Sequence, residues 1–128
     1  MMKFHSTRGS QSVNFFEAIS NGLAEKGGLY VPDEFPDLSY FKEETFQNYH
    51  DFSMRFLSLF LDEEPFKIDA KKIINASLNF PLSLKKLSDE LSVLELFHGP
   101  TLSFKDFGAR FLAQSLQVTQ KKRTILVA

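Results

Sequence analysis

The chain has 128 residues, a length typical of one domain and sufficient to bury a core. Its 43% hydrophobic and 24% charged residues exclude a disordered tail, and its formal net charge of -1 excludes the strongly basic surface of a nucleic-acid or anionic-membrane binder. The absence of cysteine excludes disulfides, zinc–thiolate sites and thiol nucleophiles. The three histidines have no metal-ligand spacing, so we expect no metal site. No targeting or membrane-spanning segment is visible, and we expect a cytoplasmic protein.

The first third of the chain predicts short elements separated by turns. Residues 3–7 favour a short strand. Asn14 and Glu17 have the spacing of a capping box, which predicts a helix over residues 15–22. The glycine pair that follows predicts a tight turn, and residues 29–31 predict a second short strand, ended by a proline. We therefore expect a small α+β region at the start of the chain.

Two amphipathic helices are predicted in the middle of the chain. Asp51 is the expected N-cap of the first, and its apolar face consists of four residues at helical spacing: Phe52, Phe56, Leu59 and Phe60. Asp69 is the expected N-cap of the second, with the apolar face Ala70, Ile73, Ile74 and Leu78. The chain has fifteen phenylalanines, so we expect most of them in the core and some at an interface with further polypeptide.

The last part of the chain predicts a β-α-β unit. Residues 84–87 favour a short strand, and residues 91–96 favour another because polar and apolar residues alternate. Ser103 and Asp106 have the spacing of a capping box and predict a helix of about sixteen residues. The apolar stripe of this helix is Phe104, Phe107, Phe111, Leu112 and Leu116. The apolar run 124–128 is expected to pair in parallel with the strand before the helix.

A parallel sheet is buried on both faces and needs more strands and helices than this chain contains. We therefore expect the chain to be part of a longer protein. The chain alone leaves its terminal strand unpaired, and an unpaired strand edge tends to bind another chain. We expect the isolated chain to self-associate through that strand.

Lys105 is the leading candidate for chemistry because it lies in the first turn of the last predicted helix. The partial positive charge of a helix N-terminus disfavours a second positive charge, and burial by Phe104 and Phe107 would act in the same direction. Lys105 would then offer the neutral amine that condenses with an aldehyde, while the free N–H groups of the helix start can hold a phosphate. From position alone, an ordinary exposed lysine is the simpler interpretation.

Two sets of motifs resemble the threonine synthase family. Residues 94–110, which contain Lys105, closely resemble the cofactor-lysine segment of that family. A second set resembles the N-terminal extension of its bacterial and fungal branch: residues 4–9, 16–18, 22–24 and 27–32. Both sets occur in the order expected for the family, and together they span most of the chain.

The resemblance implies a pyridoxal-phosphate enzyme of the β-family (fold type II), similar to tryptophan synthase β. The fold class would be α/β, with a small α+β region over residues 1–90 followed by the beginning of a parallel-sheet pyridoxal-phosphate domain over residues 91–128. The implied reaction converts O-phospho-L-homoserine and water to L-threonine and phosphate. Lys105 would carry pyridoxal 5'-phosphate and move protons between substrate carbons. The later loops that complete the family's cofactor site are absent from this sequence, so we expect the chain alone to be inactive.

Ser6, Thr7 and Arg8 offer two hydroxyls and a guanidinium at a turn, and the resemblance favours them as ligands of the substrate phosphate. A surface turn with a solvated arginine is the alternative. Arg110 is expected to be a charge on the helix face, and Asp106 a capping residue. Two other functions remain open from the sequence: a related phospho-lyase that releases 2-oxobutyrate, and a non-catalytic module that binds a partner through an aromatic surface.

Overall fold

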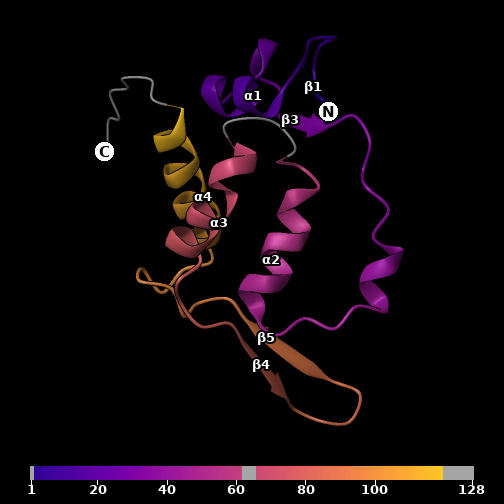
Figure 1. The fold of residues 1–128 in the computed structure, drawn as a ribbon, viewed down its shortest axis with the longest axis vertical. Helices are drawn as coiled ribbons and strands as arrows, with labels where there is room; N and C mark the ends of the chain where they lie inside the picture. The colour runs from indigo at the N-terminus through magenta and orange to yellow at the C-terminus, as the bar shows by residue number, and fades with distance from the viewer. Residues whose placement is uncertain (1, 62–65, 120–128) are drawn as a thin grey trace.

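The computed structural model describes residues 2–61 and 66–119, without the side chain of Ile68, and shows a mixed α/β arrangement (Figure 1). An antiparallel sheet and the helix α1 (Phe15–Asn21) lie at one end of the molecule. Three longer helices form its middle, and a β-hairpin projects from the opposite end. The mixed fold class predicted from the sequence is confirmed, whereas the predicted terminal strand 124–128 lies outside the described residues.

The N-terminal sheet has three strands in the order β2-β1-β3. The central strand β1 (Phe4–Ser6) confirms the predicted strand, and it pairs antiparallel with both β2 (Ser12–Val13) and β3 (Tyr30–Pro32). The sequence did not indicate β2, because two residues carry too little pattern to be recognised. The strand β3 includes Pro32, which was expected to end it. Because β3 is an edge strand, the N–H that proline lacks is not needed for pairing with β1.

The capping box of α1 is confirmed. The Asn14 side chain accepts a hydrogen bond from the Glu17 backbone N–H at 2.7 Å, and the Glu17 carboxylate accepts from the Asn14 N–H at 3.1 Å. The helix ends at Gly22, whose φ of 73° lies in the left-handed region that glycine adopts without strain. The inner face of α1 meets the sheet through a cluster of Phe4, Val13 and Ala18.

The helix α2 (Tyr49–Ser58) begins three residues earlier than predicted, with Asn48 as its N-cap. The Asn48 side chain accepts a hydrogen bond from the Asp51 N–H at 3.0 Å, and the Asp51 carboxylate accepts one from the Gln47 N–H at 3.2 Å. The prediction of Asp51 as the cap was therefore wrong. Asp51 instead lies in the first turn, where its charge complements the helix dipole.

The predicted apolar face of α2 was also wrong. The side of the helix that packs on the core carries Met54 and Leu57, followed by the buried Leu61. The phenylalanines form an aromatic row on another side, where Phe52 is 38% exposed. Successive rings in this row lie 5.2–5.9 Å apart, and they belong to Phe41, Phe46, Phe52, Phe56 and Phe60. Phe41 belongs to a short 3-10 helix, Ser39–Lys42, which precedes α2.

The main core lies where α3 (Phe66–Ser77) packs between α2 and α4 (Lys105–Val118). The four apolar residues predicted for α3 are all buried, although the helix begins three residues before Asp69, which is therefore a first-turn residue and not the N-cap. Phe66 is completely buried and meets Phe15 edge to face at 4.8 Å between ring centroids. This contact joins the N-terminal sheet region to the helices.

The hairpin consists of β4 (Ser83–Lys86) and β5 (Ser92–Glu95), paired antiparallel from Ser83 opposite Glu95 to Lys86 opposite Ser92. Both predicted strands are thus present, and the parallel partner expected for the second lies outside the described residues. The hairpin exposes several large apolar side chains: Leu84, Leu87, Leu91, Val93, Leu94 and Phe97. Its two strands lie on either side of residue 90, where a domain boundary was predicted, and that boundary stays a prediction.

Within the described ranges, no helix is long and apolar enough to cross a membrane.

Candidate functional site

Lys105 is the first residue of α4 and is exposed. Its side-chain amine forms no hydrogen bond or ion pair with the residues that the structure describes. Its backbone N–H donates to the Ser103 hydroxyl at 3.3 Å. The position of the N-cap is occupied by Phe104, which has no side-chain oxygen, so the predicted capping box of Ser103 and Asp106 was wrong.

Asp106 uses its carboxylate elsewhere. One carboxylate oxygen accepts two hydrogen bonds from Thr101, from the backbone N–H at 2.8 Å and from the hydroxyl at 2.9 Å. The side chain is buried beneath the loop, with only 4% of the residue exposed. Asp106 therefore ties the loop before α4 to the first turn of α4, whereas the sequence suggested a cap for the helix itself.

The predicted apolar stripe of α4 is only partly correct. Phe107, Phe111 and Leu116 are half-buried, but Phe104 is 66% exposed and Leu112 is also exposed. The expected burial of Lys105 by neighbouring rings is therefore absent in this chain. The reason is the rotation of α4, which turns Asp106 and Ser115 towards the interior and leaves Lys105 facing outwards.

Arg110 connects α4, in this rotation, to the end of α3. Its guanidinium donates to the backbone carbonyls of Ser77 at 2.9 Å and Ala76 at 3.1 Å, and to the Asn79 side-chain oxygen at 2.6 Å. The carbonyls belong to the last turn of α3, where a cation satisfies unpaired C=O groups and complements the helix dipole. Arg110 is therefore not a solvated charge on the helix face but the link between the end of α3 and the middle of α4.

Ser6, Thr7 and Arg8 form a turn against the glycine pair before β3. The buried Ser6 hydroxyl accepts from the Arg8 N–H at 3.1 Å, and the Thr7 hydroxyl accepts from the Leu29 N–H at 2.9 Å. A Cβ on Gly28 would collide with the Ser6 hydroxyl, so this approach requires glycine. Both hydroxyls already have backbone partners, whereas the exposed Arg8 guanidinium forms no hydrogen bond or ion pair with the residues that the structure describes and so can bind an anion.

The structure does not bring this turn to Lys105. In Figure 1, β1 lies at the upper end of the molecule beside α1, whereas α4 begins at its own lower end, on the side towards the hairpin, and ends beside α1. A helix of the length of α4 extends about 21 Å. The two candidate sites therefore lie at opposite ends of α4 in this chain.

A carboxylate–histidine pair lies before the Lys105 loop. His98 Nε2 and Glu95 Oε2 are 2.7 Å apart, and the Lys85 ammonium lies 3.2 Å from the other oxygen of Glu95. The hydrogen bond with His98, supported by Lys85 and Ser83, lowers the pKa of Glu95 from its ordinary value, although partial burial acts in the opposite direction. This pair connects the end of β5 to the start of the loop.

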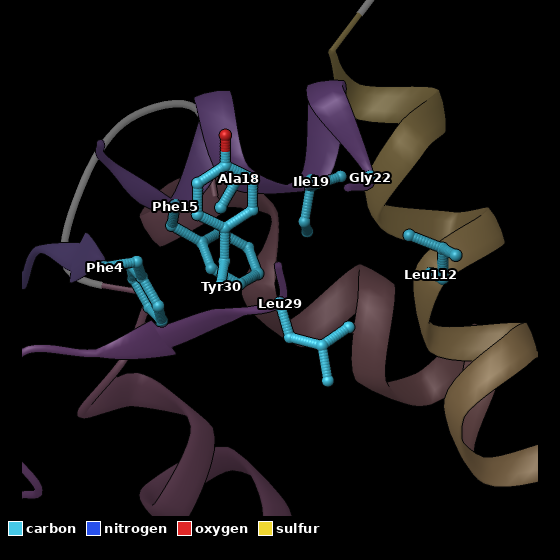
Figure 2. Close-up of a pocket in the computed structure, with 8 residues that line it drawn as sticks. All are labelled: Phe4, Phe15, Ala18, Ile19, Gly22, Leu29, Tyr30 and Leu112. Atoms are coloured by element: carbon cyan, nitrogen blue, oxygen red, sulfur yellow. The ribbon is translucent and has the colours of Figure 1, made fainter. Parts of the chain in front are cut away.

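Two apolar cavities open on the surface. The larger, of about 360 Å³, lies where the N-terminal sheet and α1 meet α4, with Leu112 facing Ile19 and Leu29 (Figure 2). The other, of about 300 Å³, lies between α2 and α4 and is lined by Phe107 and Gly108, close to the start of α4. Neither is lined by Lys105. Among the described residues, no three potential metal ligands lie together.

Comparison with known proteins explains this combination of elements. A family profile described as the N terminus of threonine synthase matches residues 3–78. The chain belongs to the threonine synthase family. The resemblance inferred from the motifs is thereby confirmed, and it now rests on more than half of the chain.

Threonine synthases of known sequence and structure match most of the chain. The protein of Serratia marcescens is 41% identical over 109 residues, which cover 84% of this chain and 25% of the relative. The protein of Escherichia coli strain K12 is 36% identical over 124 residues, which cover 93% of this chain and 29% of the relative. The crystal structure of the pyridoxal-phosphate-bound threonine synthase of Brucella melitensis has a TM-score of 0.79 at 34% identity, covering 89% of this chain and 26% of that one. The chain thus spans about a quarter of the length of these threonine synthases.

The sequence singled out Lys105 as a candidate, but it did not reveal the contacts of Gly99 and Thr101 with Asp106 that shape the loop before it. Gly99 is buried, and a Cβ on it would lie 2.6 Å from the Cβ of Asp106. Thr101 supplies both donors to Asp106. In the sequence, these residues are only a short loop before an acidic residue. That pattern is too common to predict a hydrogen bond between residues five apart, such as Thr101 and Asp106.

Proposed function

We propose that this chain is the cofactor-lysine part of a threonine synthase, which converts O-phospho-L-homoserine and water to L-threonine and phosphate. The supporting observation is the exposed amine of Lys105, without a partner among the described residues, at the first residue of a helix in a chain of this family. An amine without an ion pair is available for covalent attachment of an aldehyde.

The residues of this chain fit a pyridoxal-phosphate site in two respects. Lys105 would hold the cofactor through its amine and would move protons between substrate carbons. The first backbone N–H groups of α4 already donate to Ser103 and Phe104, but the partial positive charge of the helix N-terminus still favours an anionic group there. When bound, pyridoxal phosphate withdraws electrons from the substrate carbons and so stabilises negative charge on them.

Arg8 is proposed as a ligand of the substrate phosphate, with Ser6 and Thr7 holding the turn that presents it. Its support is the exposed guanidinium, unpaired among the described residues, on a turn fixed by two side-chain hydrogen bonds. Because the turn lies far from Lys105 in this chain, Arg8 would contact substrate only if further polypeptide, or a second subunit, brings the two together. Replacing Arg8 by Ala should raise KM for O-phospho-L-homoserine without loss of the cofactor linkage.

Four further expectations belong to the same proposal. We expect the chain by itself to be inactive and the protein to work in the cytoplasm. We also expect residues 1–90 and 91–128 to belong to different domains. The chain alone should self-associate, and the exposed apolar residues of the β4–β5 hairpin support that expectation. Sedimentation over a range of concentrations would test it, and a monomer at all of them would contradict it.

A hybrid enzyme tests the proposed activity. Residues 1–128 replace the aligned part of the Escherichia coli threonine synthase, which this chain matches over 29% of the length of that protein. The hybrid should restore growth without threonine to a strain that lacks the enzyme. Lys105→Ala should abolish growth, whereas Lys71→Ala, an equally exposed lysine on α3, should not.

The covalent assignment has its own measurement. Borohydride reduction in the presence of pyridoxal phosphate should attach the cofactor to the peptide that contains Lys105. A label on a different lysine of the folded hybrid would overturn the assignment. Product analysis with O-phospho-L-homoserine should yield threonine, and release of 2-oxobutyrate instead would overturn the proposed reaction.

A further inference from the structure

The loop before Lys105 has an unusual backbone. The Leu102 N–H donates to the Gly99 carbonyl at 3.0 Å, which closes a turn, and Leu102 has a φ of 55°. That left-handed conformation is unfavourable for a residue with a Cβ. The Leu102 side chain is 76% exposed, so it gains no packing in return. Another part of the structure must therefore hold this loop.

Asp106 is the group that holds it. Its carboxylate accepts both hydrogen bonds of Thr101, the residue directly before Leu102. Hydrogen bonds to an ionised acceptor are stronger than those between neutral groups, and a buried carboxylate needs them to replace lost water. The tight approach of Gly99 to the Asp106 side chain shows that the loop lies directly against the carboxylate.

Burial and the position of its donor distinguish Asp106 from an ordinary acidic residue in a first helical turn. Asp51 occupies such a position in α2, and it is exposed and accepts from the Gln47 N–H immediately before the helix. Asp106 is buried and accepts from a residue within the preceding loop. It thus connects a strained loop to the turn that contains the adjacent Lys105.

We infer that Asp106 is a positioning residue for Lys105. The two hydrogen bonds from Thr101 to the Asp106 carboxylate, which we call the clasp, keep the loop over residues 99–103 in its strained form. They thereby set the direction in which the first turn of α4 presents the Lys105 amine. The inference rests on the proposed function, because it gives the clasp a role in presenting the lysine to pyridoxal phosphate. Asp106 itself need not touch cofactor or substrate.

Two pairs of variants separate the effect of losing the clasp from the effect of losing the charge of Asp106. A control variant separates it from a general loss of stability. Asp106→Ala removes the acceptor, whereas Asp106→Asn keeps an acceptor oxygen without the charge. Thr101→Val removes the hydroxyl donor with little change of shape, whereas Thr101→Ser keeps it. Asp51→Ala is the matched control, a first-turn carboxylate of a different helix.

The first measurement is amide hydrogen exchange of Thr101 in the 128-residue chain. Asp106→Ala should accelerate it by about tenfold or more, the loss expected when a hydrogen bond to a charged group is removed. The Asn variant should stay within about threefold of the unaltered chain because its side-chain oxygen still accepts. Unchanged exchange in Asp106→Ala would overturn the clasp.

The second measurement is the fraction of Lys105 that borohydride labels at a subsaturating concentration of pyridoxal phosphate, in the hybrid enzyme. Asp106→Ala and Thr101→Val should lower this fraction several-fold, and Asp106→Asn and Thr101→Ser should restore most of it. Asp51→Ala should leave it unchanged. Thr101→Val provides the test if Asp106→Ala does not fold.

The outcomes distinguish this inference from the proposed function. Normal labelling of Lys105 in the variants that lack the clasp would overturn the positioning role and leave the proposed function intact. A fall that Asp51→Ala reproduces would show a general loss of stability and would also overturn it. No labelling of Lys105 in the unaltered hybrid would overturn the proposed function itself, whatever the exchange of Thr101.

Discussion

Replacement of Arg110 offers the sharpest test of how the Lys105 helix is held. The guanidinium donates three hydrogen bonds to the end of α3 and lies over the Phe80 ring, 5.8 Å from its centroid. Arg110→Ala removes all of these contacts at once. Because the Ser77 carbonyl lies in a buried turn, it would lose a donor that water cannot readily replace.

The expected loss of stability follows from the individual contacts. A hydrogen bond from a charged donor to a buried carbonyl contributes about 1.5–3 kcal/mol, and a cation at a helix C-terminus contributes about 0.3–1 kcal/mol. The bond to the exposed Asn79 adds little because water competes for both partners. Arg110→Ala should therefore lower the free energy of unfolding by about 2–4 kcal/mol. Arg110→Lys keeps the charge but not the planar fork, and should lose about half as much.

Urea unfolding of the chain, followed by far-ultraviolet circular dichroism, measures both losses. The midpoint should fall with little change in the slope, because α3 and α4 still unfold together. Lys71→Ala, on the exposed side of α3, is the control and should change stability by less than about 0.5 kcal/mol. A loss below about 1 kcal/mol for Arg110→Ala, or equal stability of the Arg and Lys proteins, would refute the account of α3–α4 docking.

Three other predictions concern single side chains. Ser115 is fully buried and its hydroxyl has no hydrogen-bond partner among the described residues, so Ser115→Ala should raise stability by about 0.5–1 kcal/mol in urea unfolding; a loss would show that the hydroxyl is satisfied. Gly28→Ala should cost about 1–3 kcal/mol because the new Cβ collides with the Ser6 hydroxyl, and an unchanged midpoint would contradict that contact. Glu95 should titrate below its ordinary pKa of 4.5 in a carbon NMR titration. Because this pKa is lowered in the folded state, the stabilising contribution of Glu95 is complete above the unfolded value and is lost as pH falls through the lower folded value. His98→Gln should move the midpoint up towards 4.5, and a midpoint at or above 4.5 in the unaltered protein would contradict the pairing.

Several features were predictable from the sequence because they depend on neighbouring residues. The capping box of α1 joins residues three apart, and the buried face of α3 repeats with the helical period. Residues 94–110 pointed to the family and to Lys105 as its cofactor lysine, and the family is confirmed. The role of Lys105 remains a proposal.

Other features were decided by contacts between distant segments. The aromatic side of α2 looked like its core-facing side, because periodicity shows that residues share a face but not which face another helix will cover. The rotation of α4 depends on Arg110 reaching carbonyls more than thirty residues earlier in the chain.

The local sequence thus indicated most of the helices and strands, and it pointed to Lys105 as the candidate cofactor lysine. The tertiary structure alone decided which faces are buried, that Arg110 docks α4, and that Asp106 clasps the loop before Lys105. The physical reason is that hydrogen-bond donors and acceptors must be satisfied in three dimensions, and a partly buried guanidinium or a buried carboxylate finds partners that spacing along the chain does not reveal.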